Sequence, residues 1–211
     1  KRENIAERGI WTAKKRYILN VWNSEGVQYS EPKLKVMGIE AVKSSTPAPC
    51  RQMIKDGLKL MMNGTEEDVI EFIDKCRVEF KALPPEQIAF PRTVSDVRKY
   101  HSHSSIYSKG TPIHARGALL FNHYIKDKKL TNKYSLIANG EKIKFLYLKK
   151  PNIIQENVIS FIQDFPHELG LDKYIDYDLQ FEKSFVEPLK AILDAIGWNV
   201  EKTVNLELFF A

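Results

Sequence analysis

The strongest constraint on the fold is a pair of helix patterns with clear start and stop signals. Hydroxyl residues followed by Pro47 are typical of a capped helix start with proline at the first helical position. Asn63 and Gly64 end this helix, Thr65 caps the next, and Pro84 stops it. Apolar residues recur every three or four positions in both helices: Met53, Ile54, Leu58 and Met61, then Val69, Ile73, Cys76, Phe80 and Leu83. The pattern predicts two antiparallel helices.

Alternating residues before this helix pair predict a small antiparallel sheet. Residues 10–22 alternate between two faces, so we expect one strand there. Residues 23–26 are a turn signal, and residues 27–29 and 34–39 are expected to form a second and a third strand. Together with the helix pair, this sheet indicates an α+β protein.

The remainder of the chain mixes short strands with helices. The expected elements are a strand at 88–90, helices at 94–100 and 112–130, and a strand after the hairpin-type turn at 139–140. A last helix begins near Asp176 or Asp178 and ends at Gly197, and Pro188 inside it is expected to kink it.

Charge divides the chain into alternating blocks. The net charge of +5 combines +6 for residues 1–65, −4 for 66–97, +10 for 98–150 and −7 for 151–211. Such blocks suggest a positive face that attracts a polyanion, although merely solvated charged stretches are the alternative. With 43% apolar residues the chain can bury a core, and no apolar run approaches the roughly 20 residues of a membrane helix.

Neither the cysteines nor the other potential ligands form a metal-site pattern. Cys50 and Cys76 lie in apolar-periodic stretches, which indicates buried thiols in a reducing compartment, hence the cytoplasm. A second close pair of ligands, as a Cys/His site needs, is absent from the sequence. The residues that could imitate a metal site are His101, His103, Asp172, Asp176 and Asp178. The histidines lack an obvious third ligand, and the acids suit the positive end of a helix better.

A basic run, Lys14, Lys15 and Arg16 beside Tyr17, suggests a nucleic-acid contact. Three consecutive cations on one strand put charge on both faces, which suits a polyanion, and a solvated edge is the alternative. The run GIWTAKKRY, followed by EPKLKVMGIEAVKSSTP, closely resembles the palm-to-thumb junction of family B DNA polymerases, nearest those of large tailed bacteriophages. Similar blocks follow in order: PIHARGALLFNHYI, EKIKFLYL and FEKSFVEPLKAILDAIG. The resemblance covers essentially the whole chain.

This resemblance implies the C-terminal part of a replicative polymerase. Its parts would be the end of the palm at residues 1–38, a mainly helical thumb at 39–200 with a small β-subdomain near 134–165, and a tail at 201–211. The first residues look like mid-chain sequence, so we expect a piece of something longer. The catalytic portion would be attached covalently or encoded as a separate chain.

The resemblance also implies DNA-binding residues. Lys15 and Lys43 would reach the minor groove of the nascent duplex, where every correct base pair offers an acceptor at an equivalent place. Such a contact tests base-pair shape without reading sequence. The other implied contacts are backbone contacts or braces from Lys14, Arg16 and Tyr17, and phosphate contacts from His114 and Arg116.

The tail has the spacing of a sliding-clamp peptide. Thr203, Leu206, Phe209 and Phe210 stand where such a peptide has a polar residue and three apolar anchors, and Leu208 adds to the apolar group. Glutamine usually stands at the position of Thr203, which leaves the polar contact open. The alternative is a terminus that packs on its own domain.

The sequence lacks the carboxylates that polymerase and exonuclease catalysis require. It contains no Asp-Thr-Asp run for the two-metal phosphoryl transfer of this family, and no exonuclease carboxylates. We therefore expect no catalysis by the chain alone and no cofactor in it, with Mg²⁺ serving the complete polymerase. The expected partners are primer–template double-stranded DNA, a sliding clamp and the N-terminal catalytic portion, with no membrane. The alternatives are a stand-alone nucleic-acid-binding module and a small metal-dependent nuclease.

Overall fold

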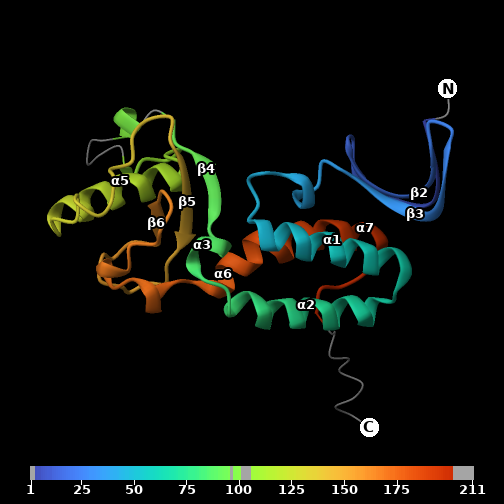
Figure 1. Ribbon diagram of the computed structural model, residues 1–211. Helices are drawn as coiled ribbons and strands as arrows, with labels where there is room; N and C mark the ends of the chain where they lie inside the picture. The colour runs from blue at the N-terminus through green and yellow to red at the C-terminus, as the bar shows by residue number, and fades with distance from the viewer. Residues whose placement is uncertain (1–2, 96, 101–105, 202–211) are drawn as a thin grey trace, which may run out of the picture. The chain divides into compact units, whose positions relative to one another are not determined.

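A computed structural model describes residues 3–95, 97–100 and 106–201. The chain falls into two compact units, Lys1–Lys81 with Phe181–Ala211, and Ala82–Gln180. Each unit contains one three-stranded antiparallel sheet together with helices (Figure 1). The predicted α+β class is therefore confirmed. The predicted palm, thumb and tail boundaries stay a prediction.

The first sheet shows that the single strand expected at residues 10–22 is wrong. Strand β1 (Asn4–Ala13) pairs with β2 (Arg16–Ser24), and Ala13 lies opposite Arg16. Lys14 and Lys15 therefore form a two-residue turn between two strands. The sequence pattern missed it because Lys15 adopts a left-handed φ of +62° without the glycine or asparagine that normally signals such a turn.

Strand β3 (Val27–Met37) is one continuous strand, where the sequence pattern predicted two. The interruption in the pattern comes from Pro32, which lies beside a register shift in the pairing with β2. Because the sheet order is β1-β2-β3, β3 is an edge strand. An edge strand tolerates proline, since its outer N–H groups have no neighbour to bond in the sheet.

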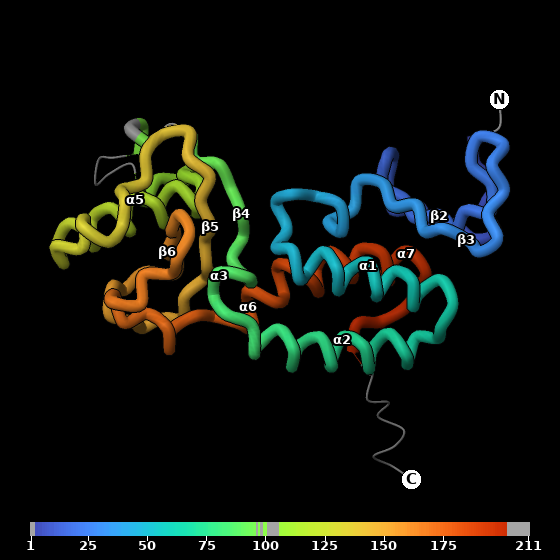
Figure 2. Tube along the Cα trace, viewed as in Figure 1, coloured from blue at the N-terminus to red at the C-terminus, as the bar shows by residue number. Residues whose placement is uncertain are grey.

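The predicted antiparallel helix pair is confirmed as α1 (Ala48–Asn63) and α2 (Glu66–Lys81), and Figure 2 traces the reversal of the chain between them. Thr65 caps α2 as expected, because its Oγ1 accepts the amide N–H of Asp68 at 3.3 Å. The start of α1 differs from the prediction. Pro47 is the N-cap residue rather than the first helical residue, and no side-chain cap forms.

Helices of the same unit pack on the first sheet and complete its hydrophobic core. The π segment Glu182–Val186 leads directly into α7 (Glu187–Ile196), which contacts both α1 and β1. The π segment accommodates Pro188, whose missing N–H cannot make an ordinary helical bond. Fully buried side chains of this core include Ile18, Ile54, Leu58, Phe80, Phe185 and Leu189. Arg8 adds a polar tie by donating to the Met62 carbonyl, 2.6 Å away, in the last turn of α1.

The second unit places one long helix on a short sheet. Its strands are β4 (Phe90–Thr93), β5 (Lys142–Tyr147) and β6 (Val158–Phe161), with α5 (Ile113–Asp127) against β6. Gly117 allows the close approach, because a Cβ there would lie 2.5 Å from Ser160 Oγ. The strand predicted at 88–90 is wrong in position. Residues Pro85–Ile88 form the short helix α3, and the strand begins at Phe90.

Short helical turns complete this unit. They are η2 (Val97–Tyr100), η3 (His167–Leu169) and η4 (Asp172–Tyr174), followed by α6 (Tyr177–Phe181). Helix α6 thus begins directly after Asp176, one of the two helix starts that the sequence suggested. Asp176 Oδ1 accepts the Leu179 amide N–H at 3.1 Å. This contact is a helix cap, as expected for that acid.

The prediction that the two cysteines are buried free thiols is confirmed. Cys50 and Cys76 are free and buried, and burial raises their thiol pKa values to about 11 and about 12. Both thiols are therefore protonated and unreactive at neutral pH. Among the described residues, no group of His, Cys, Asp and Glu is arranged to hold a metal ion, and no helix could span a bilayer.

Candidate nucleic-acid interface

The basic run forms the tip of the β1–β2 hairpin. Lys14 and Lys15 occupy the turn and are exposed, whereas Arg16 is the first residue of β2 and is half-buried. The expectation of three cations on one strand is therefore corrected. Two lysines extend from a tight turn, and only the arginine belongs to the strand.

Gly38 fixes the position of this turn. It follows β3, has a left-handed φ of +68°, and an added Cβ would lie 2.2 Å from the Lys15 carbonyl oxygen. The backbones of Lys15 and Gly38 are therefore in direct contact. Only glycine satisfies both requirements, the positive φ and the absence of a side chain.

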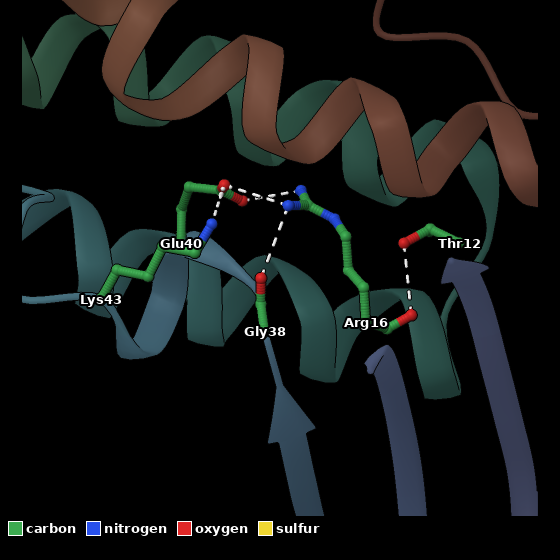
Figure 3. A network of polar contacts seen from close by, with 5 residues as sticks. All are labelled: Thr12, Arg16, Gly38, Glu40 and Lys43. Atoms are coloured by element: carbon green, nitrogen blue, oxygen red, sulfur yellow. Dashed lines mark hydrogen bonds and ion pairs between the residues drawn. The ribbon is translucent and has the colours of Figure 1, made fainter. Parts of the chain in front are cut away.

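Glu40 belongs to a network of polar contacts with Arg16 and Lys43 (Figure 3). Its Oε2 accepts Arg16 Nη2 at 2.7 Å, and its Oε1 accepts Arg16 Nη1 at 3.1 Å. Lys43 Nζ donates to the same Oε1 at 2.8 Å. One carboxylate therefore joins the first residue of β2 to the residue that follows the 3₁₀ turn η1 (Glu40–Val42).

Two further contacts hold Arg16 in place. Arg16 Nη1 reaches the Gly38 carbonyl at 3.5 Å, and Thr12 Oγ1 donates to the Arg16 carbonyl at 3.3 Å. The Glu40 side chain is 21% exposed. This burial raises the pKa of Glu40, but hydrogen bonds from Arg16 and Lys43 outweigh it, so the net pKa lies below the usual value. Glu40 is therefore ionised at neutral pH.

Tyr17 lies on the other face of the sheet from Arg16, because consecutive strand residues point to opposite sides. It pairs with Trp11 and Met37 across the sheet, and the Trp11 and Tyr17 ring centroids are 6.4 Å apart. Trp11 is 63% exposed. Tyr17 therefore contacts a neighbouring ring of the hairpin, and both of its predicted roles, a backbone contact or a brace, stay predictions.

The residues predicted to touch phosphates lie in the second unit, on α5. His114 is half-buried, with its ring centroid 6.2 Å from that of Phe145. Burial, and then the charge of Arg92, lower the pKa of His114, so the ring is mainly neutral at pH 7. The neutral ring carries little charge, and its single N–H bonds to the Thr93 backbone.

Arg116 is also half-buried, and its Nη2 donates to Asn157 Oδ1 at 2.6 Å. Its Nε is buried and has no hydrogen-bond partner among the residues that the structure describes. Arg116 is thus held by the residue that precedes β6.

The structure brings together the first group of predicted residues. Lys14, Lys15, Arg16 and Lys43 lie around Glu40 and Gly38 in one unit, whereas His114 and Arg116 belong to the other. The predicted clamp residues lie outside the described part of the chain: Thr203, Leu206, Leu208, Phe209 and Phe210. His101 and His103 also lie outside it. The DNA-binding and clamp-binding roles stay predictions.

Sequence reasoning missed Gly38 and Glu40. Both lie within the block EPKLKVMGIEAVKSSTP, but their contacts reach residues more than 20 positions away. A positional signal existed for Glu40, which stands three residues before Lys43 and forms an i,i+3 ion pair with it. No local pattern indicates the pairing with Arg16.

Comparison with known proteins gives this surface a context. No protein-family model matches the chain. It is 31% identical over 206 residues to the DNA-directed DNA polymerase of Enterobacteria phage T4, and 34% identical over 203 residues to that of Escherichia phage RB69. The alignments cover 96% and 94% of this chain but 22% of each polymerase, so the chain spans about a fifth of the length of these curated relatives. The chain is therefore homologous to a C-terminal part of the T4 and RB69 DNA-directed DNA polymerases.

Proposed function

We propose that this chain is the part of a family B phage DNA polymerase that grips the primer–template duplex and binds a sliding clamp. The observation that carries the duplex grip is the exposed Lys14–Lys15 turn, with Arg16 and Lys43 held beside it by one carboxylate. The homology to two phage DNA polymerases supports the same assignment. The residues would act in the cytoplasm of an infected host, next to the polymerase's catalytic portion.

The chemistry of the grip is a sequence-independent contact. A lysine ammonium is a compact donor that bonds a minor-groove acceptor or a phosphate oxygen alike. Minor-groove acceptors occupy equivalent places in every correct base pair, so Lys15 and Lys43 would test pairing without reading sequence. Lys14 and Arg16 would neutralise phosphates. The catalytic carboxylates and their Mg²⁺ ions would come from the rest of the polymerase.

The second unit would add contacts through α5. Arg116 is oriented by Asn157, and its Nη1 and remaining Nη2 N–H groups would donate to a phosphate. His114 would donate to a phosphate in its protonated form, which is the minor form at pH 7. These assignments come from the resemblance of the block that contains both residues, and the orientation of Arg116 supports the one for the arginine.

Fluorescence anisotropy of the 211-residue chain tests the duplex grip. We expect equal affinity for a primer–template duplex and for duplexes of unrelated sequence, and weaker affinity for single strands. Three or four phosphate contacts would give a slope of log K against log salt of about −3. Preference for one duplex sequence would favour a stand-alone binding module, and absence of duplex binding at low salt would contradict the proposal.

The tail is tested separately with a variant that carries Leu206→Ala, Phe209→Ala and Phe210→Ala. We expect its affinity for a phage sliding clamp to fall by at least about 30-fold, because loss of even one buried apolar anchor of this kind costs about 2 kcal/mol or more. Duplex affinity should stay unchanged, since the substitutions remove no charge. Surface plasmon resonance on immobilised clamp measures the first, and anisotropy the second. Unchanged clamp binding would favour a terminus that packs on its own domain.

A further inference from the structure

We propose that Glu40 is a positioning residue of the duplex-gripping surface, which holds Arg16 and Lys43 in the arrangement that meets DNA. The inference rests on the proposed duplex grip and assigns a role to a residue that touches no DNA itself. It follows from three contacts of one carboxylate, from the charge of the surface around it, and from the place of Glu40 in the chain.

The contacts orient Arg16 and leave part of it available. The guanidinium donates from Nη1 and Nη2 to both Glu40 oxygens, at 3.1 and 2.7 Å, and Nη1 also reaches the Gly38 carbonyl at 3.5 Å. A guanidinium has five N–H groups, and these contacts use only some of them. Nε and the second N–H of Nη2 can still donate to a phosphate. Glu40 thus fixes the plane in which Arg16 would offer them.

Lys43 is restrained by the same carboxylate. Its Nζ lies 2.8 Å from Glu40 Oε1, and its side chain is 43% exposed. Arg16 directly follows the Lys14–Lys15 turn, and Lys43 lies between η1 and α1. A flexible lysine and a flexible arginine, 27 positions apart, are therefore held side by side by one group. Without it, both side chains would have to be ordered when DNA binds, which lowers affinity.

The negative charge of Glu40 means that positioning and simple electrostatic repulsion predict opposite effects on duplex affinity. An ionised carboxylate beside a surface that meets phosphates repels them, so charge counting alone predicts tighter duplex binding when Glu40 is neutralised. Positioning predicts the reverse, because loss of the carboxylate releases Arg16 and Lys43. The two explanations differ in the sign of the effect.

The test compares Glu40→Gln with Glu31→Gln, an equal change of charge at an exposed position on β3 of the same unit. Both proteins and the parent chain are titrated against the same primer–template duplex by anisotropy from 50 to 300 mM salt. We expect Glu40→Gln to weaken binding about three- to tenfold at 100 mM salt and to make the salt slope shallower by about 1, as for one lost phosphate contact. Glu31→Gln should bind as the parent does, or slightly tighter.

The salt slope separates positioning from a merely structural role. Circular dichroism melts establish a temperature at which all three proteins are folded, and the titrations are run there. Weaker binding by Glu40→Gln with an unchanged slope would mean that no ionic contact was lost, and would overturn the inference. Binding by Glu40→Gln as tight as that of Glu31→Gln, or tighter, would overturn it as well.

Failure of the proposed function gives a different result. If the parent chain binds no duplex at 50 mM salt, the duplex grip itself is rejected for this chain, and the role of Glu40 in it falls too. If the parent binds and Glu40→Gln is unaffected, only the role of Glu40 is rejected.

Discussion

Replacing both turn lysines, Lys14→Ala together with Lys15→Ala, is expected to weaken duplex binding by about 100-fold near 100 mM salt. Both side chains are exposed at the tip of the β1–β2 hairpin, and each would make one charged contact. A hydrogen bond to a charged group contributes about 1.5 kcal/mol or more, which is about tenfold in affinity for each lysine. Because Lys14 would contact a phosphate and Lys15 a minor-groove acceptor, the slope of log K against log salt should become shallower by about 1. Anisotropy across a salt series measures both quantities.

The matched control removes two lysines from an acidic surface. Lys75 and Lys81 are exposed on α2, a helix whose first turn carries three acids, and Lys75→Ala with Lys81→Ala changes the net charge by the same amount. We expect less than a threefold loss of affinity for this control. Equal losses in the two variants would mean that net charge alone drives binding, and would remove the special role of the turn.

Gly38→Ala is expected to lower the free energy of unfolding by about 2–4 kcal/mol, from left-handed strain of about 1–2 kcal/mol and a steric clash in addition. The added Cβ would lie 2.2 Å from the Lys15 carbonyl oxygen, so either the turn or the end of β3 must move. Because the turn carries both lysines, duplex affinity should fall as well. Urea unfolding followed by circular dichroism measures the stability.

Gly26→Ala provides the control for backbone strain. Gly26 also has a positive φ, +93°, but an added Cβ there meets nothing within 4 Å. This substitution should lower stability only by the strain of the left-handed conformation and should leave DNA binding unchanged. If Gly38→Ala and Gly26→Ala destabilise equally and neither affects binding, the contact between Gly38 and Lys15 has no role in placing the turn.

Local patterns predicted the regular elements well where start and stop residues were clear. The α1–α2 pair was predicted because Asn63, Gly64 and Thr65 mark the turn and the apolar positions follow a helical period. The β1–β2 turn was missed for the opposite reason. Its residues are two lysines, and the side-chain alternation continues on both sides of them. Positive φ at Lys15 depends on contacts, Gly38 among them, that no short window of sequence contains.

The candidate site was only partly predictable. Lys14, Lys15, Arg16 and Lys43 stood out through their charge and through the resemblance to a polymerase family. Glu40 did not, because an acid three residues before a lysine is common and carries no information about a distant arginine.

The sequence by itself determined the α+β class, the helix pair and the homology to phage DNA polymerases, because these depend on residue periodicity and on ordered blocks of residues. Only the tertiary structure determined how the cationic side chains are arranged in space. It bent the basic run into a turn, placed Gly38 against Lys15, and brought Glu40 between Arg16 and Lys43. The physical reason is that Gly38 meets Lys15, and Glu40 meets Arg16, across more than 20 positions of sequence, and the geometry of these contacts is set by strand pairing and the packing of the sheet on the helices.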